Sequence, residues 1–310
     1  MVATHGGARM IRYGVDIGGT KVAAAAIDDA GRRLDEVRAP VPRGDYGGTV
    51  EAVRAAVSAL AARIGAPVER LGVCAPGIVE AAAGRISLGN TDWLRGRPFR
   101  DDLAAATGAP VRLANDADCF ALSEAVDGAG QGARSTFGVI LGTGVGGGFV
   151  VDGRLVSGPR GIAGEIGHVP LPRASAEELA AGPCSCGRRG CVEALLSGPS
   201  LARDFGAATG RQAADARAVA DLAAAGDAEA CAAFARYEER LARTLALVVN
   251  LVEPEAIVLG GGVSNVERLY ANVPALMTPH VFGGVCETRL ARAQHGDSSG
   301  VRGAARLWDR

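Results

Sequence analysis

The sequence has almost no net charge, and it has no long hydrophobic run. Its 310 residues include 33 basic and 34 acidic side chains, for a net charge of −1, so there is no basic footprint for nucleic acid. No apolar run approaches the roughly 20 residues of a membrane span, and the opening MVATHGGARM has no apolar signal segment. We therefore expect a soluble, cytoplasmic protein with no nucleic-acid or membrane partner, and a disordered extension over residues 1–9.

A disulfide framework and lysine are also missing. Lys21 is the only lysine, which we attribute to a genome biased toward arginine codons. Seven cysteines are an odd number, and this favours a reducing compartment over paired disulfides. Four of them stand alone in apolar surroundings: Cys74, Cys119, Cys231 and Cys286.

The other three cysteines form a cluster with a histidine. His168, Cys184, Cys186 and Cys191 have the spacing H-x15-C-x-C-x4-C, and three thiols with one imidazole make a complete tetrahedral zinc set. Four protein ligands leave no open position for water, so the pattern predicts a structural Zn2+.

Two carboxylates flank this cluster. Glu165 precedes the first ligand on the same turn, and Glu193 follows the last ligand by two residues. Carboxylates that each accept two hydrogen bonds suit a hydroxyl-rich ligand such as a sugar. The second ring nitrogen of His168 is a further candidate for a substrate hydroxyl.

Glycine turns indicate a site for nucleotide phosphates. Gly142, Gly144 and Gly147 match G-x-G-x-x-G, but a β-branched, alternating segment follows instead of a helix, so a Rossmann site is excluded. A glycine turn between strands exposes amides to an anion, although a plain hairpin is the alternative for any single turn. The candidate ATP-binding residues are Gly18, Gly19, Thr20 and Lys21, then Gly142, Thr143 and Gly144, then Gly260, Gly261 and Gly262.

The same turns predict the architecture. The two hairpins are about 125 residues apart, each near the start of a β-then-α half, which indicates two α/β lobes with a cleft between them. Asp16, beside the first turn, suits a hydrated Mg2+. We expect helical structure over 197–252 and a closely packed last helix from about Ser299 that contains Gly303 and other small residues.

Asn115 and Asp116 fall between a predicted strand over 111–114 and a predicted helix. One of the two can simply cap the helix, but this junction is also where α/β proteins place ligand-facing groups. An aspartate there can accept the proton of an alcohol that attacks a γ-phosphorus. We therefore predict Asp116 as the general base, and Asn90 as a polar contact or a turn residue.

With these motifs the chain resembles the ROK family (repressors, open reading frames and kinases). The resemblance rests on DIGGTK at Asp16, APG at Ala75, NDAD at Asn115, GTGVGGG at Gly142, GEIGH at Gly164, CSCGRRGC at Cys184 and GGG at Gly260. It implies a two-lobed, actin-like (ribonuclease H-like) ATPase fold with an interlobe cleft and a zinc-stabilised loop. The lobes would be 10–117 with 295–310, and 118–294.

The resemblance also implies an activity, the ATP- and Mg2+-dependent phosphorylation of a hexose at its 6-hydroxyl by a homodimer. It implies Asp116 as the base. The sugar ligands it implies are Asn90, Asn115, Asp116, Glu165, His168 and Glu193.

Within the family, VRLANDADCFALSEAVDGA, VFGGVCET and QHGDSSGVRGAA are most similar to the fructokinase/mannokinase branch. This makes fructokinase, acting on fructose and also on mannose, the leading function. The alternative is an N-acetylglucosamine kinase or a glucokinase, and a distant alternative is a sugar-responsive regulator without kinase activity. Cys74 stands where the family usually has glycine, and we expect it to crowd a backbone approach. Ile166 replaces a common aromatic residue, and we expect it to alter sugar preference.

Overall fold

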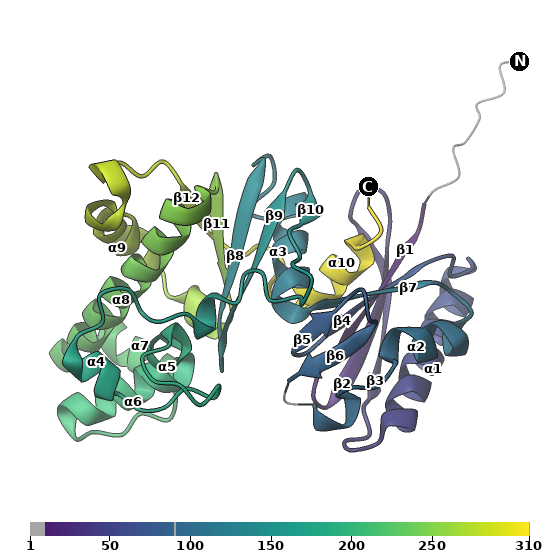
Figure 1. The fold of residues 1–310 in the computed structure, drawn as a ribbon, viewed down its shortest axis with the longest axis horizontal. Helices are drawn as coiled ribbons and strands as arrows, with labels where there is room; N and C mark the ends of the chain where they lie inside the picture. Colours follow the sequence, from purple (N-terminus) through teal and green to yellow (C-terminus); the bar gives the residue numbers. More distant parts are fainter. Residues whose placement is uncertain (1–9, 90, 310) are drawn as a thin grey trace, which may run out of the picture. The chain divides into compact units, whose positions relative to one another are not determined.

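A computed structural model describes residues 10–89 and 91–309 of the chain. The extension expected over residues 1–9 and the predicted sugar ligand Asn90 lie outside the described residues. The chain forms two compact units that each combine helices and strands (Figure 1), as an α/β fold with two lobes predicts. Unit 1 comprises residues 10–123, 154–163 and 297–309, and unit 2 comprises residues 124–153 and 164–296.

Unit 1 is built on a five-stranded sheet in the order β3-β2-β1-β4-β7. β1 and β2 pair antiparallel through the first glycine turn, and β4 and β7 continue the sheet in parallel. Alternate side chains of β1, such as Val15, join a core with Val53 and Val57 of helix α1. The strands are β1 (Arg12–Ile17), β2 (Lys21–Ile27), β3 (Arg33–Pro40), β4 (Leu71–Ala75) and β7 (Val111–Asn115). The small hairpin of β5 (Ile78–Glu80) and β6 (Arg85–Leu88) is separate.

The last helix, α10 (Ser299–Arg306), covers the other face of this sheet. Gly14 alternates with the core residues of β1 and therefore faces α10. A Cβ on Gly14 would clash with the backbone at Val301, and one on Gly72 would clash with that of Ala304. The close packing predicted for the last helix is confirmed. The other helices of this part are α1 (Tyr46–Ile64), α2 (Phe99–Thr107) and α3 (Asp116–Asp127), whose last residues belong to unit 2.

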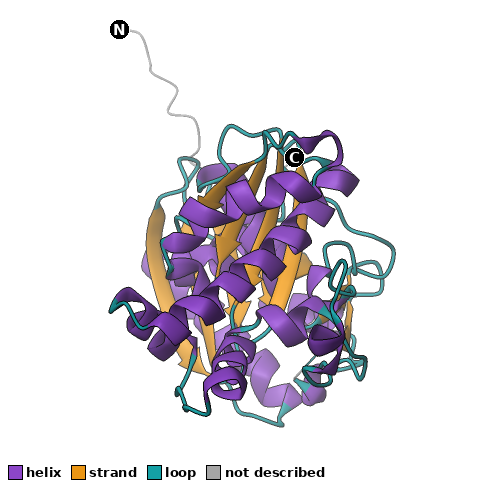
Figure 2. Cartoon of the chain, turned by 90° about the vertical axis from the view of Figure 1, so that its left-hand side faces the viewer, coloured by secondary structure: helices purple, strands orange, loops and turns teal. Residues whose placement is uncertain are grey.

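Unit 2 contains a second sheet, with neighbouring strands in the order β9-β8-β11-β12. β8 and β9 form the second predicted hairpin, and β11 and β12 add parallel strands. Figure 2 shows the helices of this unit lying across its strands. The strands are β8 (Ser135–Leu141), β9 (Val145–Val151), β11 (Ala256–Gly260) and β12 (Arg289–Arg292), and the two-residue β10 (Arg154–Leu155) follows β9 along the chain.

The alanine-rich stretch over 197–252 is helical, but it forms three helices. Gly210 ends the first with φ 72°, and Gly226 follows the second with φ 87°; both angles lie in the left-handed region that glycine adopts at helix ends. The three helices are α6 (Gly198–Thr209), α7 (Ala216–Ala224) and α8 (Ala228–Val252). The others in unit 2 are α4 (Ala176–Ala180), α5 (Val192–Leu196) and α9 (Arg268–Met277).

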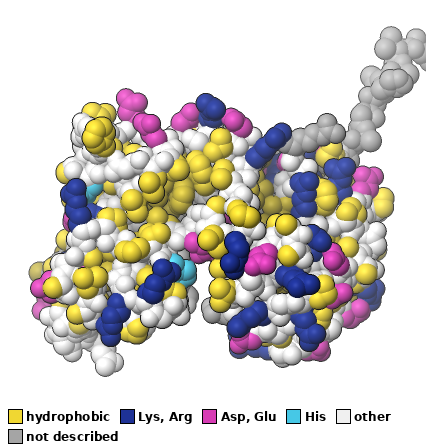
Figure 3. Space-filling model, in the orientation of Figure 1, with side chains coloured by type: hydrophobic (Ala, Val, Ile, Leu, Met, Phe, Trp, Pro, Cys, Tyr) yellow, Lys and Arg dark blue, Asp and Glu magenta, His cyan; other side chains and the backbone are white. Residues whose placement is uncertain are grey.

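One segment of the chain belongs to a different unit than expected. The segment 154–163 groups with unit 1 by its contacts, whereas the lobe boundaries expected above include it in the large lobe. On the face shown in Figure 3, basic and acidic side chains are interspersed. Among the described helices, none is long and apolar enough to cross a membrane.

Candidate functional site

The first glycine turn places Asp16 at the end of β1. The Gly18 amide donates to the Lys21 carbonyl at 2.9 Å and closes the turn. Lys21, which opens β2, is exposed. A carboxylate, a glycine turn and an ammonium group therefore lie within six consecutive residues of one hairpin.

Asp16 lies against the beginning of α10. A Cβ on Gly300 would be 2.8 Å from Asp16 Oδ2, so glycine at this position lets the carboxylate approach the helix closely. Burial raises the pKa of Asp16, a hydrogen bond from Cys74 opposes that shift, and the nearby charge of Asp116 adds to it. Two carboxylates of unit 1 thus interact, and a divalent cation would relieve their repulsion.

Asn115, not Asp116, caps helix α3. Asn115 Oδ1 accepts from the Asp118 amide at 2.6 Å, as a capping side chain does. Asp116 is the first residue of the helix, and its Oδ1 accepts from the Ala117 amide at 2.9 Å. Its side chain is exposed, yet the surrounding protein raises its pKa through desolvation. The capping role therefore falls to Asn115, and the Asp116 carboxylate is available to a ligand.

The second glycine turn is in contact with other glycine-containing segments of unit 2. The Gly142 amide donates to Gly144 O at 3.0 Å within the turn, and the Gly198 amide donates to Gly142 O at 2.7 Å. Gly261 packs on the backbone at Leu141, where a Cβ would be 2.5 Å from the carbonyl oxygen. The structure therefore brings together two of the predicted phosphate segments, 142–144 and 260–262.

A cavity of about 710 Å3 opens beside this turn. It is lined by the predicted residues Gly142, Thr143 and Gly262, together with residues that the sequence analysis missed. Among the missed residues, Asp215 caps α7 and Asn265 follows the third glycine segment. No motif marked Asp215, because the packing of α6 and α7 brings it to the cavity. The missed lining residues include Gly198, Pro199, Asp215, Arg217 and Asn265.

The predicted metal ligands also lie together. The ligand atoms of His168, Cys184 and Cys186 are all within 4.8 Å of one another, and Cys191 Sγ is 3.7 Å from Cys186 Sγ. The Gly187 amide donates to Cys184 O at 2.9 Å in a tight turn. Three of the four predicted ligand atoms thus form one group and Cys191 adjoins it through Cys186, and one imidazole with three thiols is a residue set that suits tetrahedral Zn2+.

The loop with His168 packs directly on the second hairpin. Gly164 has φ 86°, and a Cβ there would be 2.6 Å from Gly147 O. Glu165 precedes the short 3-10 helix Ile166–His168 and is half-buried. Ile166 is only 6% exposed and belongs to the core of unit 2, so its side chain packs inward. The contact places Glu165 and His168 beside the hairpin.

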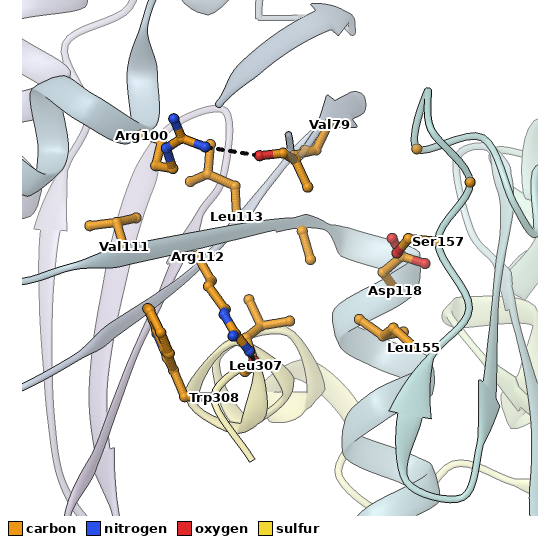
Figure 4. A pocket seen from close by; sticks show the side chains of 14 residues that line it. Val79, Arg100, Val111, Arg112, Leu113, Asp118, Leu155, Ser157, Leu307 and Trp308 are labelled. Carbon is orange, nitrogen blue, oxygen red and sulfur yellow. Dashed lines mark hydrogen bonds between the residues drawn. The ribbon is translucent and has the colours of Figure 1, made fainter. Parts of the chain in front are cut away.

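A second cavity, of about 490 Å3, lies at the outer edge of β7 in unit 1 (Figure 4). Asp118 and Ser157 lie at one end of it and Arg100 at the other. Arg112 stacks on the Trp308 ring at 4.2 Å. Asn115 and Asp116 do not line this cavity, so we do not assign it to the sugar.

Comparison with known proteins places these features in a family. A family model described as the ROK family matches residues 12–310. The chain is 36% identical over 299 residues to the N-acetyl-D-glucosamine kinase of Photobacterium profundum, which covers 95% of this chain and 98% of that protein.

Solved structures agree with this match. The ROK hexokinase from Thermus thermophilus superposes with a TM-score of 0.85 at 34% identity, covering 96% of this chain and 97% of that one. A ROK family glucokinase from Streptomyces griseus, in complex with glucose and AMPPNP, has a TM-score of 0.77 at 31% identity, covering 96% and 99%. The two-lobed α/β fold expected from the sequence is confirmed.

Proposed function

The chain belongs to the ROK family and is a sugar kinase, and we propose that it transfers the γ-phosphoryl group of ATP to the 6-hydroxyl of N-acetyl-D-glucosamine. The observation that carries the proposal is the pair Asp16 and Asp116, two interacting carboxylates beside a glycine turn. Phosphoryl transfer needs mainly positioning and charge neutralisation, with one base for the attacking hydroxyl.

In this proposal Asp116 is the base and Asp16 helps to hold the Mg2+ that accompanies ATP. The raised pKa of Asp116 makes it a better proton acceptor than an ordinary carboxylate. Mg2+ neutralises charge on the phosphates when it is bound with ATP.

We assign the phosphates to the glycine turns and the nucleoside to the cavity of unit 2. In the second turn the Gly142 amide is used within the turn and the Val145 amide is used by Glu193, so Thr143 and Gly144 are the proposed donors there. Gly260, Gly261 and Gly262 form the third proposed phosphate segment, which is next to that turn because Gly261 packs on the backbone of Leu141 and Gly142. In the first turn the proposed contacts are Gly18, Gly19, Thr20 and Lys21.

The sugar ligands in this proposal are Asn115, Glu165, His168 and Glu193, together with Asn90. Zn2+ at His168, Cys184, Cys186 and Cys191 has a structural role, which is to fix the loop that carries Glu165 and the helix that carries Glu193. Carboxylate and amide groups can bind several sugar hydroxyls at once.

The relatives support N-acetylglucosamine over the expected fructose. Similar curated proteins include N-acetyl-D-glucosamine kinases at 36–37% identity over nearly the whole chain, and the fructokinase/mannokinase branch is not supported. Glucose is the second candidate, because the similar solved structures include a glucokinase with bound glucose.

A coupled ADP-release assay tests the proposal, with N-acetylglucosamine, glucose, N-acetylmannosamine, mannose and fructose in parallel. We expect the highest kcat/KM for N-acetylglucosamine. A higher kcat/KM for glucose or fructose would reject the proposed substrate, and no ADP release with any sugar would reject the kinase activity. Light scattering of the same sample checks the homodimer, which stays a prediction.

A further inference from the structure

Both carboxylate oxygens of Glu193 accept hydrogen bonds inside unit 2. Oε1 accepts from the Ser185 hydroxyl at 2.6 Å, and Oε2 accepts from the Val145 amide at 3.1 Å. Glu193 lies in the first turn of α5 and is half-buried. The side chain is therefore held at two points, in one orientation.

The two donors come from different functional segments. Ser185 lies between the candidate metal ligands Cys184 and Cys186, on the exposed metal loop. Val145 is the first residue of β9, directly after the tip of the second glycine turn. Glu193 is thus a direct link between the metal loop and the phosphate turn.

Glycine at position 144 allows this link. A Cβ on Gly144 would lie 2.7 Å from Glu193 Oε2, so a larger residue would push the carboxylate away from the Val145 amide. Glycine here serves the approach of Glu193 as well as the approach of a phosphate.

We propose that Ser185 is a positioning residue that acts through Glu193 to hold the second glycine turn in its ATP-binding form. The inference rests on the proposed function, because it takes residues 142–144 as a phosphate site. It adds a role for a residue that is neither a metal ligand nor a candidate sugar ligand.

The physical argument concerns rotation of one carboxylate. A hydrogen bond to an ionised oxygen is short and stronger than a neutral one, and 2.6 Å fits this class. Without the Ser185 hydroxyl, Oε1 loses its short hydrogen bond and keeps a 3.6 Å contact with Cys184 Sγ. A zinc-bound Cys184 thiolate has no proton to donate, so the carboxylate can turn away from Val145. The Val145 amide then lacks its acceptor, and the turn samples other conformations in which it binds ATP less well.

The same link couples the sugar to the nucleotide. Glu193 is a proposed sugar ligand. A bound sugar would donate hydrogen bonds to the remaining lone pairs of its carboxylate, hold the carboxylate in place and thereby order the second glycine turn. By linkage, ATP must then strengthen sugar binding by the same factor.

The test is the dissociation constant of Mg-ATP, measured by calorimetry without sugar on the zinc-loaded full chain. We expect Ser185→Ala to raise this dissociation constant by about fivefold or more, which is the lower end of typical coupling between sites. Ser185→Thr keeps the hydroxyl and should give the wild-type constant. Zinc content, measured by metal analysis, is expected to stay at the wild-type value.

The matched control is Ser175→Ala. It removes another serine–carboxylate hydrogen bond of unit 2, the 2.7 Å bond from Ser175 Oγ to Glu177, and should leave the constant unchanged. In a Glu193→Ala background, Ser185→Ala should change the constant by less than about twofold, because a residue that acts through Glu193 has no effect without it.

An unchanged ATP constant in Ser185→Ala would overturn the inference. Loss of zinc in Ser185→Ala, or a full effect that persists in the Glu193→Ala background, would overturn it as well, since Ser185 would then act through the metal or directly. If wild-type protein binds ATP but phosphorylates no sugar, the proposed function is rejected. The positioning role of Ser185 is then still decided by the ATP dissociation constants of the variants.

Discussion

Cys74 and Asp16 occupy paired positions on the adjacent parallel strands β4 and β1, and hydrogen bonding by the Cys74 thiol lowers the pKa of the Asp16 carboxylate. Cys74 is 1% exposed and packs with Cys119 and Ala304. The side chain that was expected to crowd a backbone approach is therefore accommodated in a buried cluster. Its thiol opposes the rise in the pKa of Asp16 that burial causes.

Replacing Cys74 should change the Mg2+ requirement. In Cys74→Ala the pKa of Asp16 rises further, because the donor to the charged form is gone. A larger share of Asp16 is then protonated at mildly acidic pH, so the Mg2+ concentration for half-maximal activity should rise more there than at alkaline pH. Kinetic titration with Mg2+ measures this. Two variants serve as controls and should resemble wild type: Cys74→Ser, which keeps a donor, and Cys119→Ala, which removes only the neighbouring thiol. An equal rise in the required Mg2+ concentration in all three variants would contradict the hydrogen-bond role of Cys74.

Asp116→Asn should abolish most of the turnover. Loss of a general base typically costs about 100- to 10,000-fold in rate, while the fold and ATP binding should persist because Asn115 caps the helix. Asp101→Asn, also in the first turn of a helix and paired with Arg100, is the control and should keep wild-type kcat. More than a tenth of wild-type activity in Asp116→Asn would rule out the base.

The pH profile gives a second test of Asp116. Desolvation by the surrounding protein raises its pKa above the ordinary 3.8, and the base acts when deprotonated. The acidic limb of kcat/KM should therefore lie at higher pH than an ordinary aspartate would give, and activity should fall as the pH drops through it. A flat profile down to the ordinary value would exclude Asp116 as the titrating base.

Local spacing in the sequence was enough to predict several parts of the molecule. Both hairpins and the cysteine–histidine cluster were found because a turn or a short loop determines their geometry within a few residues. β3 was missed because RLDEVRAP is charged and has no apolar alternation to mark an edge strand.

Tertiary contacts could not be predicted in the same way. Glu193 accepts hydrogen bonds from Ser185, which is 8 residues away in the sequence, and from Val145, which is 48 residues away. No sequence motif predicts which of these donors binds which carboxylate oxygen. The division of 197–252 into three helices coincides with two positive-φ glycines, Gly210 at the end of α6 and Gly226 two residues after α7.

Metal removal should destabilise unit 2 and reduce activity together. Chelation or Cys184→Ser should lower Tm by about 4 °C or more, the shift expected for roughly 2 kcal/mol in a unit of this size, because Zn2+ would hold both the metal loop and Glu193. Cys231→Ser is the control, since this thiol lies outside the cysteine–histidine cluster and donates to Ala223 O at 3.5 Å, a bond that serine can keep. Active, stable protein with no zinc in a metal analysis would refute the structural role.

Gly303→Ala should destabilise unit 1 although alanine favours helices. A Cβ at Gly303 would overlap the backbone at Cys119, and overpacking of this kind costs about 1–3 kcal/mol. Gly158→Ala, where nothing lies within 4 Å of the added Cβ, should stay within about 0.5 kcal/mol of wild type. Urea denaturation compares them, and a stabilised Gly303→Ala would disprove the tight contact between α10 and α3.

Glu178 should make the stability of unit 2 depend on acidic pH. Burial alone would raise its pKa, but hydrogen bonds from Arg243, the Ser175 amide and Arg240 lower it from 4.5 to about 2. A carboxylate with a depressed pKa contributes its stabilisation above the unfolded value, so the contribution should be lost as the pH falls from 4.5 toward 2.

Substitution gives the matching test of this ion cluster. Glu178→Gln leaves the buried Arg240 and Arg243 without their shared partner, and breaking a buried pair in this way costs about 3–5 kcal/mol. Glu177→Gln, at the exposed neighbouring position, should leave the stability close to that of wild type. Urea unfolding of both variants at neutral and acidic pH measures the difference, and it should shrink at acidic pH because wild-type Glu178 is then losing its charge. A difference that is constant with pH would show that the side chain stabilises unit 2 by packing rather than by charge.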